Sequence, residues 1–234
     1  MTLKRRVVIL LTFCDGVLHR TKRFQADYRY TMQLLGNRNA DEVVVIDVTP
    51  AERRTANRHL FYDALERYAH ECFSPITVGG GIRTIEEVRH LIANLCADKV
   101  VIGTEHLVAN DDRLARDITW KFGAQVLVAA VNHPHPHHDG QIPREFGELL
   151  LNSIERDGSL MGYDIELLKL ARQHVDVPIM VAGGCGTWKH MAEAFEAGAD
   201  AACTSVIHHL TETSLAACKD WLGKNCKQPV RAAA

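Results

Sequence analysis

The chain has 234 residues, of which 47% are hydrophobic and 24% charged, with a formal net charge of −2 at pH 7. This length suits one α/β barrel, and the near-neutral charge provides no basic field for nucleic acid or an acidic membrane surface. The longest apolar runs, such as VLVAAV from Val126, have the length of strands and are too short to span a membrane. We therefore expect a globular protein that binds neither nucleic acid nor membrane.

The N-terminus carries basic residues ahead of an apolar stretch, an arrangement that also occurs in signal peptides. The stretch ends at Cys14-Asp15-Gly16 without a small-residue cleavage site, which favours a first strand. The seven cysteines are scattered without metal-binding or disulfide spacing. We predict reduced thiols in a cytoplasmic protein.

Short apolar runs rich in β-branched residues alternate with longer helical patterns along the chain, as in parallel α/β proteins. Most runs are almost entirely apolar, which is typical of strands buried on both faces. Eight such units predict a closed (β/α)8 barrel, or TIM barrel, and an open doubly wound sheet is the alternative. The predicted strands begin near Arg6, Glu42, Pro75, Lys99, Gln125, Glu148, Pro178 and Ala201.

Helical periodicity occupies most of the gaps between these strands. The predicted helices span roughly residues 53–71, 84–95, 111–122, 164–174, 187–197 and 211–222, with Thr84 and Thr187 as N-caps. Two gaps are irregular. Residues 25–40 hold at best a short helix, and 133–147 (HPHPHHDGQIPREFG) have too little periodic sequence for a full one. We therefore expect the helices after strands one and five to be shortened or missing.

The sequence contains an internal repeat. The segment GGGIRTIEEVRHLIANLCADKVVIGT, from Gly79, resembles AGGCGTWKHMAEAFEAGADAACTS, from Ala182. Both read as strand, glycine turn, threonine cap, helix, Ala-Asp and strand, half the chain apart. The repeat favours a duplicated half-barrel. Because no linker divides the chain, residues 1–234 are predicted to form a single domain.

Two glycine turns, at 79–81 and 183–186, each follow a predicted strand and precede a helix. Such turns bring backbone N–H groups close to an anion, and the helix N-terminus adds partial positive charge. The next strands end in Gly103-Thr104 and Thr204-Ser205, whose hydroxyls suit phosphate oxygens. The alternative is that the glycines only turn the chain tightly. Two related turns at equivalent barrel positions favour a site for two phosphates of one ligand.

Several runs carry a specific resemblance: GGGIRT, ADKV, NSIERDGSLMGYDIEL, VAGGCG, EAFEAGADAA and the closing PVR. Together they resemble the cyclase subunit of imidazole glycerol phosphate synthase, over nearly the whole chain and most densely from Pro75 onward. The resemblance implies a barrel that binds a two-phosphate, ribonucleotide-derived substrate at the C-terminal ends of its strands. It also implies a separate glutaminase subunit, which docks at the N-terminal face of the barrel and supplies ammonia.

The resemblance implies phosphate-binding positions on both sides of the barrel mouth. Gly103 stands where the family usually has an asparagine, so one side-chain hydrogen bond is expected to be absent. The positions are Gly81, Gly103 and Thr104 on one side, and Asp157, Gly158, Gly184, Thr204 and Ser205 on the other.

The resemblance also implies an ammonia gate, which the family forms from charged residues at the bottom of the barrel. The matching residues, each at the start of a predicted strand, are Arg6, Glu42, Lys99 and Glu148, and Asp98 matches a glutaminase-facing position. Two acids and two bases can close around a pore as salt bridges. The alternative is that strand starts carry charges for solubility. Four matching positions favour the gate.

The chain departs from the family at the catalytic positions. The family uses two aspartates as general acid and base, and the residues aligned with them here are Thr12 and Asn132. Neither side chain exchanges a proton near neutral pH, so the family's mechanism should be impaired. Asp15 and Asp47 are the obvious carboxylates left near the ends of the early strands; Asp15 suits a turn, whereas Asp47 faces either the mouth or the core. Arg20 replaces a substrate-loop lysine and keeps its positive charge.

Histidines crowd the predicted mouth. Imidazoles can bind a metal ion or transfer protons, and they are a candidate source of the missing acid and base. No cysteine or carboxylate partner has metal-like spacing, so a solvated loop is the favoured interpretation. We predict no metal site and no cofactor, and inert thiols at Cys14 and Cys185. The histidines are His133, His135, His137 and His138 after strand five, and His208 and His209 after strand eight.

Three functions are compatible with these features. The favoured one is a synthase subunit that accepts ammonia from a glutaminase, binds a phosphorylated or nucleotide-linked substrate and transfers nitrogen to a sugar. Relatives of the cyclase in bacterial surface-sugar pathways also lose the strand-one aspartate before a similar turn. The second is a genuine cyclase whose acids come from elsewhere, for example from the histidine-rich loop. The third is a non-catalytic subunit that binds a phosphorylated ligand or regulates a partner.

Overall fold

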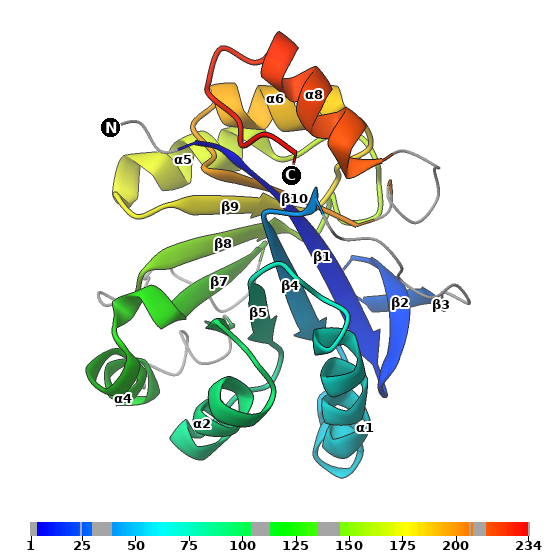
Figure 1. Cartoon of the computed structure of the whole chain (residues 1–234), viewed down its shortest axis with the longest axis vertical. Helices are drawn as coiled ribbons and strands as arrows, with labels where there is room; N and C mark the ends of the chain where they lie inside the picture. Colours follow the sequence, from blue (N-terminus) through cyan, green and yellow to red (C-terminus); the bar gives the residue numbers. More distant parts are fainter. Residues whose placement is uncertain are drawn as a thin grey trace.

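The sheet at the centre of the protein is a barrel of eight parallel strands (Figure 1). The strands are β1 (Arg6–Cys14), β4 (Glu42–Asp47), β5 (Ile76–Gly79), β6 (Lys99–Ile102), β7 (Leu127–His133), β8 (Glu148–Ser153), β9 (Ile179–Ala182) and β10 (Ala201–Thr204). The structure is a computed structural model that describes residues 4–23, 25–29, 39–103, 113–134, 146–205, 207 and 214–233. Strands β10 and β1 pair from Arg6↔Ala201 to Ile9↔Thr204, which closes the ring. The eight predicted strands are confirmed, and the closure excludes the open sheet.

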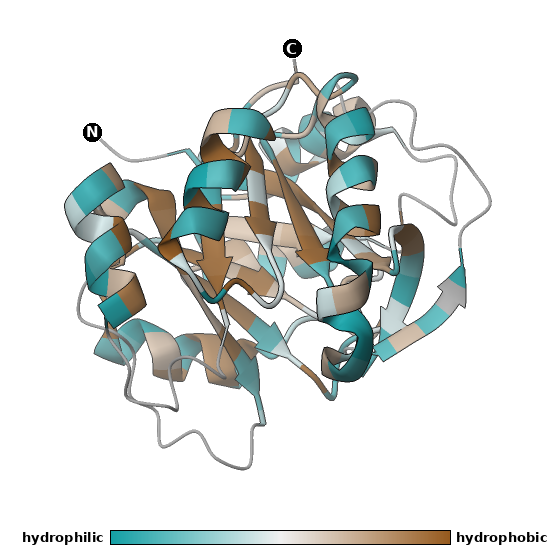
Figure 2. Cartoon of the chain, turned by 90° about the horizontal axis from the view of Figure 1, so that it is seen from below, coloured by the Kyte–Doolittle hydropathy of each residue, from teal (hydrophilic) through white to brown (hydrophobic). Residues whose placement is uncertain are grey.

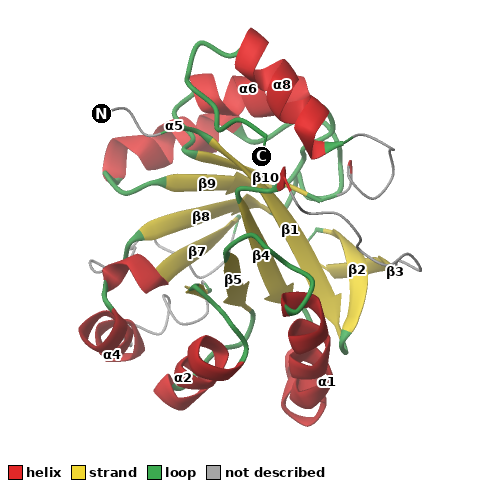
Figure 3. Cartoon of the chain, in the orientation of Figure 1, coloured by secondary structure: helices red, strands yellow, loops and turns green. Residues whose placement is uncertain are grey.

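Six helices of the described chain surround the barrel (Figure 3). They are α1 (Ala51–Ala69), α2 (Ile85–Asn94), α4 (Arg113–Phe122), α5 (Ile165–His174), α6 (Trp188–Glu196) and α8 (Leu215–Asn225). Both predicted N-caps are confirmed: Thr84 accepts the Glu87 amide in a capping box, and Thr187 accepts the His190 amide. These caps satisfy backbone donors that a helix start otherwise leaves without partners.

Side chains on the barrel strands alternate between two cores. One set, which includes Val7 and Ile9, packs between the strands and the helices. The other, which includes Val8 and Val44, fills the barrel interior. Figure 2 shows the strands mainly in brown and the helices with teal outer surfaces. Because successive side chains of a strand point to opposite faces, the position of a polar residue along its strand decides whether it reaches the interior.

A β-hairpin follows β1, where the sequence analysis expected at best a short helix. Strand β2 (Val17–Lys22) pairs antiparallel with β1, and β3 (Gln25–Arg29) pairs antiparallel with β2. The turn residues Asp15 and Gly16 have φ angles of 51° and 73°. Asp-Gly with two positive φ angles is a strong hairpin signal, although the Asp-Gly pair was predicted only as a turn. The described residues 25–29 thus hold no helix, in agreement with the expected loss of the helix after strand one, although the hairpin itself was not predicted, and residues 30–38 lie outside the described part.

The loop between β7 and β8 is described only at Pro134 and at residues 146–147. The expectation of a reduced helix at 135–145 lies outside the described residues and stays a prediction. Among the described helices, none is long and apolar enough to cross a membrane.

Candidate functional site

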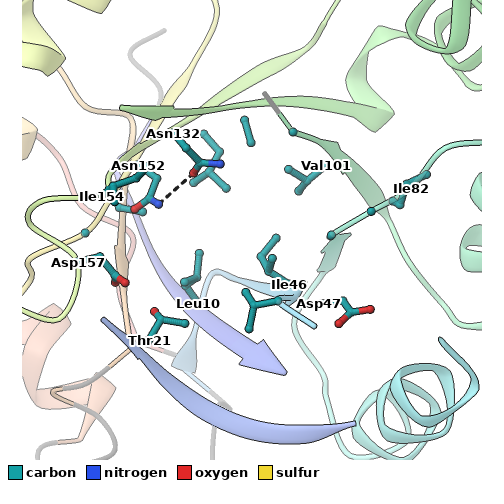
Figure 4. Close-up of a pocket in the computed structure, with 18 of the residues that line it drawn as sticks. Leu10, Thr21, Ile46, Asp47, Ile82, Val101, Asn132, Asn152, Ile154 and Asp157 are labelled. Atoms are coloured by element: carbon teal, nitrogen blue, oxygen red, sulfur yellow. Dashed lines mark hydrogen bonds between the residues drawn. The ribbon is translucent and has the colours of Figure 1, made fainter. Parts of the chain in front are cut away.

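A cavity of about 280 Å³ opens at the C-terminal ends of the barrel strands. Its floor is apolar and includes Leu10, Ile46 and Val101, whereas Asp157 and Asp47 lie on opposite sides of it (Figure 4). A second cavity of about 30 Å³ adjoins the first and extends toward the end of β10. An apolar floor with polar groups around the rim is typical of small-molecule sites, and the C-terminal face is where TIM barrels bind ligands.

The cavities bring together the predicted phosphate-binding residues that the structure describes. Asp157 lines both cavities, and Thr104 lies outside the described residues. Gly81 and Gly103 line the large cavity, and Gly158, Gly184, Thr204 and Ser205 line the small one. The described members of the two predicted groups therefore line two adjoining cavities, and Asp157 lines both.

Backbone packing requires glycine in both turns but not at Gly103. Gly80 has φ of 98°, and a Cβ there would lie 2.2 Å from the carbonyl oxygen of Asp47. Gly184 has φ of 97°, and a Cβ there would lie 2.2 Å from the carbonyl oxygen of Gly162. At Gly103, by contrast, a Cβ would meet no described atom within 4 Å. The turns are thus built by close backbone approach, whereas position 103 is open.

The hydroxyl of Thr204 is buried at the rim of the small cavity. It lies near the Cys185 thiol but makes no hydrogen bond of normal geometry with the described residues. A buried hydroxyl without such a partner is costly, and a ligand oxygen would satisfy it. Burial raises the pKa of the Cys185 thiol, so this cysteine lacks the electropositive setting of a reactive thiol.

The two positions predicted to correspond to the family's acid and base carry no titratable group. Thr12 is on the interior-facing side of β1, but its hydroxyl donates to the His19 carbonyl of β2 at 2.6 Å. It is 1% exposed and is not among the described residues that line the cavities. Asn132 does line the large cavity, and its side-chain oxygen accepts from Nδ2 of Asn152 at 3.0 Å (Figure 4). These groups can donate and accept hydrogen bonds but cannot exchange protons near neutral pH.

Asp47 reaches the large cavity as a buried, paired carboxylate. Its Oδ2 accepts from Nη1 of Arg58 at 2.8 Å, and its Oδ1 accepts from the Thr49 amide at 3.0 Å. Burial alone would lower the pKa of Arg58, but Tyr62 and Asp47 outweigh it and raise that pKa above its ordinary value. The same Nη1 donates to the Gly80 carbonyl at 2.7 Å, so the pair also supports the glycine turn. Arg58 could not be predicted from the sequence, because nothing local marks a helix residue as the partner of a strand end.

Arg20 and Asp15 lie outside the cavity lining. Arg20 pairs with Asp27 across the hairpin and is not among the described residues that line either cavity. Asp15 accepts hydrogen bonds from Asn57 (2.8 Å) and Arg53 (3.1 Å) of α1. The Asn57 bond, with help from Arg53, holds the pKa of Asp15 below its ordinary value. Asp15 thus fastens the hairpin turn to α1.

The histidine-rich loop contributes one described side chain. His133 is the last residue of β7 and is exposed. The predictions for His135, His137, His138, His208 and His209 fall outside the described residues. Within the described segments, no three His, Cys, Asp or Glu side chains are grouped closely enough to hold a metal ion.

A closed ring of ion pairs lies at the opposite end of the barrel. Arg6 pairs with both Glu42 and Glu148, and Nζ of Lys99 lies 3.0 Å from Glu42 and 2.7 Å from Glu148. The two carboxylates are buried, and Glu42 also accepts from the Thr77 hydroxyl at 2.6 Å. The pKa of Arg6 is lowered by burial but raised more by Glu148 and Glu42, so that it lies above its ordinary value. All four predicted residues therefore meet in one alternating ring of charge.

Asp98 lies beside this ring and is exposed. One of its carboxylate oxygens accepts the backbone amide of Ile76 at 2.8 Å. The side chain thus has a local role at the start of β5 while it remains accessible at the bottom of the barrel.

Comparison with known proteins gives a consistent relationship. Residues 4–214 match the family described as "Histidine biosynthesis protein". The chain is 34% identical to the imidazole glycerol phosphate synthase subunit HisF of Streptomyces coelicolor, over 99% of this chain and 100% of that protein. It is 32% identical to the HisF subunit of Exiguobacterium sibiricum, over 94% and 96%, and 36% identical to that of Thermococcus gammatolerans, over 79% of each. The chain therefore belongs to the histidine biosynthesis protein family, as a HisF-like member.

Proposed function

We propose that this protein is the synthase component of a glutamine amidotransferase system, in which a glutaminase subunit supplies ammonia for nitrogen transfer to a phosphorylated or nucleotide-linked sugar. One observation carries the proposal. The charge ring at the bottom of the barrel is complete, whereas Thr12 and Asn132 occupy the acid and base positions at the top. A barrel that keeps the charge ring but lacks the acid and base favours a protein that still receives ammonia from a glutaminase and uses it in a different reaction.

The ring is suited to act as an ammonia gate. Four charges that neutralise one another in pairs can close a narrow passage without leaving an isolated buried charge. Apolar side chains such as Val8 and Val128 fill the barrel interior above the ring, so a route for ammonia through it would be apolar. An apolar passage suits neutral ammonia and disfavours ammonium, because a bare cation in such surroundings is strongly destabilised. We infer that the glutaminase docks on this face, where Asp98 is exposed.

The cavity at the other end is suited to the acceptor. We infer phosphate contacts at Gly81, Gly103 and Thr104 on one side, and at Asp157, Gly158, Gly184, Thr204 and Ser205 on the other. The unsatisfied Thr204 hydroxyl supports the second group. Asn132 and Asn152 also line the large cavity and present amide groups there. Amides can recognise sugar hydroxyls by hydrogen bonding.

A genuine cyclase of histidine biosynthesis is the second candidate. The relatives that match this chain over nearly its full length carry the name imidazole glycerol phosphate synthase subunit HisF. Proton transfer would then require groups other than Thr12 and Asn132. Asp47 lines the cavity, but it already pairs with Arg58, and His133 lies at the end of β7.

The test is turnover of the histidine-pathway cyclase substrate with saturating ammonium salt, which bypasses any glutaminase. The wild type is compared with a Thr12→Asp, Asn132→Asp double variant, which restores both carboxylates. The control is Thr12→Asn, which together with Asn132 presents amides of the same shape as the two carboxylates without their charge. We expect turnover only in the double variant, because only it has an acid and a base facing the substrate.

Each outcome selects one function. Turnover by the wild type would overturn the argument from lost acids and establish the second candidate. Turnover by the double variant alone would support a barrel that kept its substrate site and changed its chemistry. If neither turns over, sugar nucleotides are tested with the glutaminase present. Binding without turnover under every nitrogen source would identify a non-catalytic, phospholigand-binding subunit.

A further inference from the structure

Arg54 is the one cation among the described residues that line the large cavity. It lies in the first turn of α1, and its Nε donates to the Thr49 carbonyl at 2.8 Å, which fixes the side chain. The side chain lies directly over Gly81, where a Cβ would come within 2.5 Å of its Cδ and 2.7 Å of its Nη1. No carboxylate of the described chain pairs with Arg54. Its terminal nitrogens are therefore available to a ligand beside the first glycine turn.

The helix that follows the first glycine turn, α2, supplies little positive charge to this end of the cavity. The Thr84 hydroxyl accepts the Glu87 amide, and the Glu87 carboxylate accepts the amides of Arg83 and Thr84. Glu86 and Glu87 both lie in the first turn of α2 and offset its dipole. At the opposite end, α6 has no acidic residue in its first turn. We therefore expect the binding of an anion beside Gly81 to depend mainly on Arg54. The binding of an anion beside Gly184 should depend less on any single side chain.

Gly103, at the same end of the cavity, has no described residue packed against the place where a side chain would begin. Gly103 lines the same cavity, and a Cβ on it would meet no described atom within 4 Å. Packing against the described residues thus does not require glycine here, and we expect a larger side chain to extend into the cavity that Gly103 lines. An anion held by Arg54 consequently has room for a second substituent on the Gly103 side.

From these observations we propose that Arg54 binds an anionic group of the substrate at the Gly81–Gly103 end, and that this group is a diphosphate. The planar guanidinium can donate two parallel hydrogen bonds to phosphate oxygens, and with Nε already bonded, Nη1 and Nη2 form that fork. The proposal rests on the proposed function in one respect, since both require a phosphorylated ligand in the cavity. It goes beyond it by naming the residue that selects the ligand.

The experiment is a titration of ¹⁵N-glycine-labelled protein followed by ¹H–¹⁵N correlation spectra. The chain has 16 glycines, so the spectrum is simple, and the glycines report each end of the cavity separately. Gly81 and Gly103 report one end, and Gly158 and Gly184 the other. The probes are inorganic phosphate and inorganic pyrophosphate. In the wild type we expect shifts at both ends, with pyrophosphate binding more tightly than phosphate at the Gly81–Gly103 end.

Two variants and one control test the role of Arg54. Arg54→Ala should weaken binding at Gly81 and Gly103 by about tenfold or more, with Gly184 unchanged, because a charge-assisted contact is lost. Arg54→Lys should restore part of the loss. Arg53→Ala is the matched control, because Arg53 is its neighbour on α1 but pairs with Asp15 and does not line the cavity. Unperturbed signals of the remaining glycines show that each variant is folded.

The ligand class is tested by Gly103→Asn. This variant should weaken pyrophosphate binding at its own end by about tenfold while phosphate binding is retained, since the added side chain occupies the space of the second phosphoryl group. Equal weakening of both probes would overturn the diphosphate assignment. Unchanged affinity at Gly81 and Gly103 in Arg54→Ala would overturn the role of Arg54 while leaving phosphate binding intact. An absence of shifts at both ends of the wild type would overturn the proposed phosphate site itself.

Discussion

Thr12 shows how one hydrogen bond can set the chemistry of a position. Its hydroxyl donates to the His19 carbonyl at 2.6 Å and is buried, so this threonine joins β1 to the hairpin. The buried pair of Asp47 and Arg58 behaves similarly, because the carboxylate is committed to a guanidinium and a backbone amide. Polar side chains at the mouth of the barrel, such as Thr12 and Asp47, are therefore committed to contacts within the protein that stabilise the mouth.

The variant Thr12→Asp should be less stable than the wild type by about 1–3 kcal/mol, because a carboxylate would face the His19 carbonyl without a donor between them. Thr12→Asn should lose less, since its amide can still donate to that carbonyl. Urea unfolding at pH 7 measures both free energies of unfolding. Equal stability of the aspartate variant and the wild type would show that the hydrogen bond is unimportant. The same measurement establishes the temperature range in which the double variant is folded for the turnover assay.

At the scale of elements, the hairpin of β2 and β3 is held against α1 by its turn. Gly16 lies so close to α1 that a Cβ would be 2.5 Å from the Leu60 carbonyl oxygen, and its φ of 73° is unfavourable for other residues. Asp15 adds hydrogen bonds to Asn57 and Arg53 of the same helix. The hairpin places Thr21 on the cavity wall, so its docking shapes the site.

Two glycine substitutions should change stability in opposite directions. Gly16→Ala should lower the free energy of unfolding by more than about 1 kcal/mol, because of the positive φ and the contact with Leu60. Gly223→Ala, inside α8, should raise it by about 0.5–1 kcal/mol, since a Cβ there meets nothing within 4 Å among the described atoms and alanine favours the helix. Denaturant unfolding of both variants checks this. A stabilised Gly16→Ala variant would contradict the close packing of the hairpin turn against α1.

At the scale of the whole molecule, barrel closure separates two kinds of site. The charge ring lies where the strands begin, the phosphate-binding candidates lie where they end, and an apolar interior lies between them. The C-terminal segment lies beside the start of β1, where the Arg5 amide donates to the Pro229 carbonyl at 2.7 Å. Burial in this architecture also raises the pKa of several thiols, and that of Cys218 to about 12.

These thiols make the stability of the protein fall in alkaline solution. In the unfolded chain a thiol ionises near pH 8.5, whereas the buried Cys218 remains protonated up to its raised pKa of about 12. Between these values the unfolded state binds fewer protons, so the free energy of unfolding decreases with pH by up to about 1.4 kcal/mol per unit for each thiol. The stability that the buried thiols contribute is therefore fully present below pH 8.5 and is lost above it.

Urea unfolding between pH 7.5 and pH 10 measures this decline. Cys218→Ala should make the decline less steep, since one buried thiol is removed. Met191→Leu is the control, because it changes the contact of the Cys218 sulfur at 3.7 Å without removing an ionisable group. A slope that is the same in Cys218→Ala and the control would contradict the role of this thiol.

Much of the fold was predictable, because its signals are local. Apolar runs such as VVV at 43–45 mark strands, and Thr84 with Glu87 marks a helix start, whatever the rest of the chain does. The candidate site was predictable only in part. Gly81 and Gly184 could be found from their turns and from the family resemblance, whereas Arg54 and Arg58 could not. These arginines matter because α1 packs beside the ends of β4 and β5, and no sequence period encodes that contact.

The sequence by itself determined the eight strands, their order, the glycine turns and the charged residue at the start of four of the strands. Local propensity and alternation suffice for these, because each depends on neighbours along the chain. Only the tertiary structure decided that Arg6, Glu42, Lys99 and Glu148 form one ring, that Thr12 belongs to a hairpin, and that Arg54 lies over Gly81. The reason is barrel closure, which sets the distances between side chains that are far apart in sequence, and these distances decide which charges pair and which remain available to a ligand.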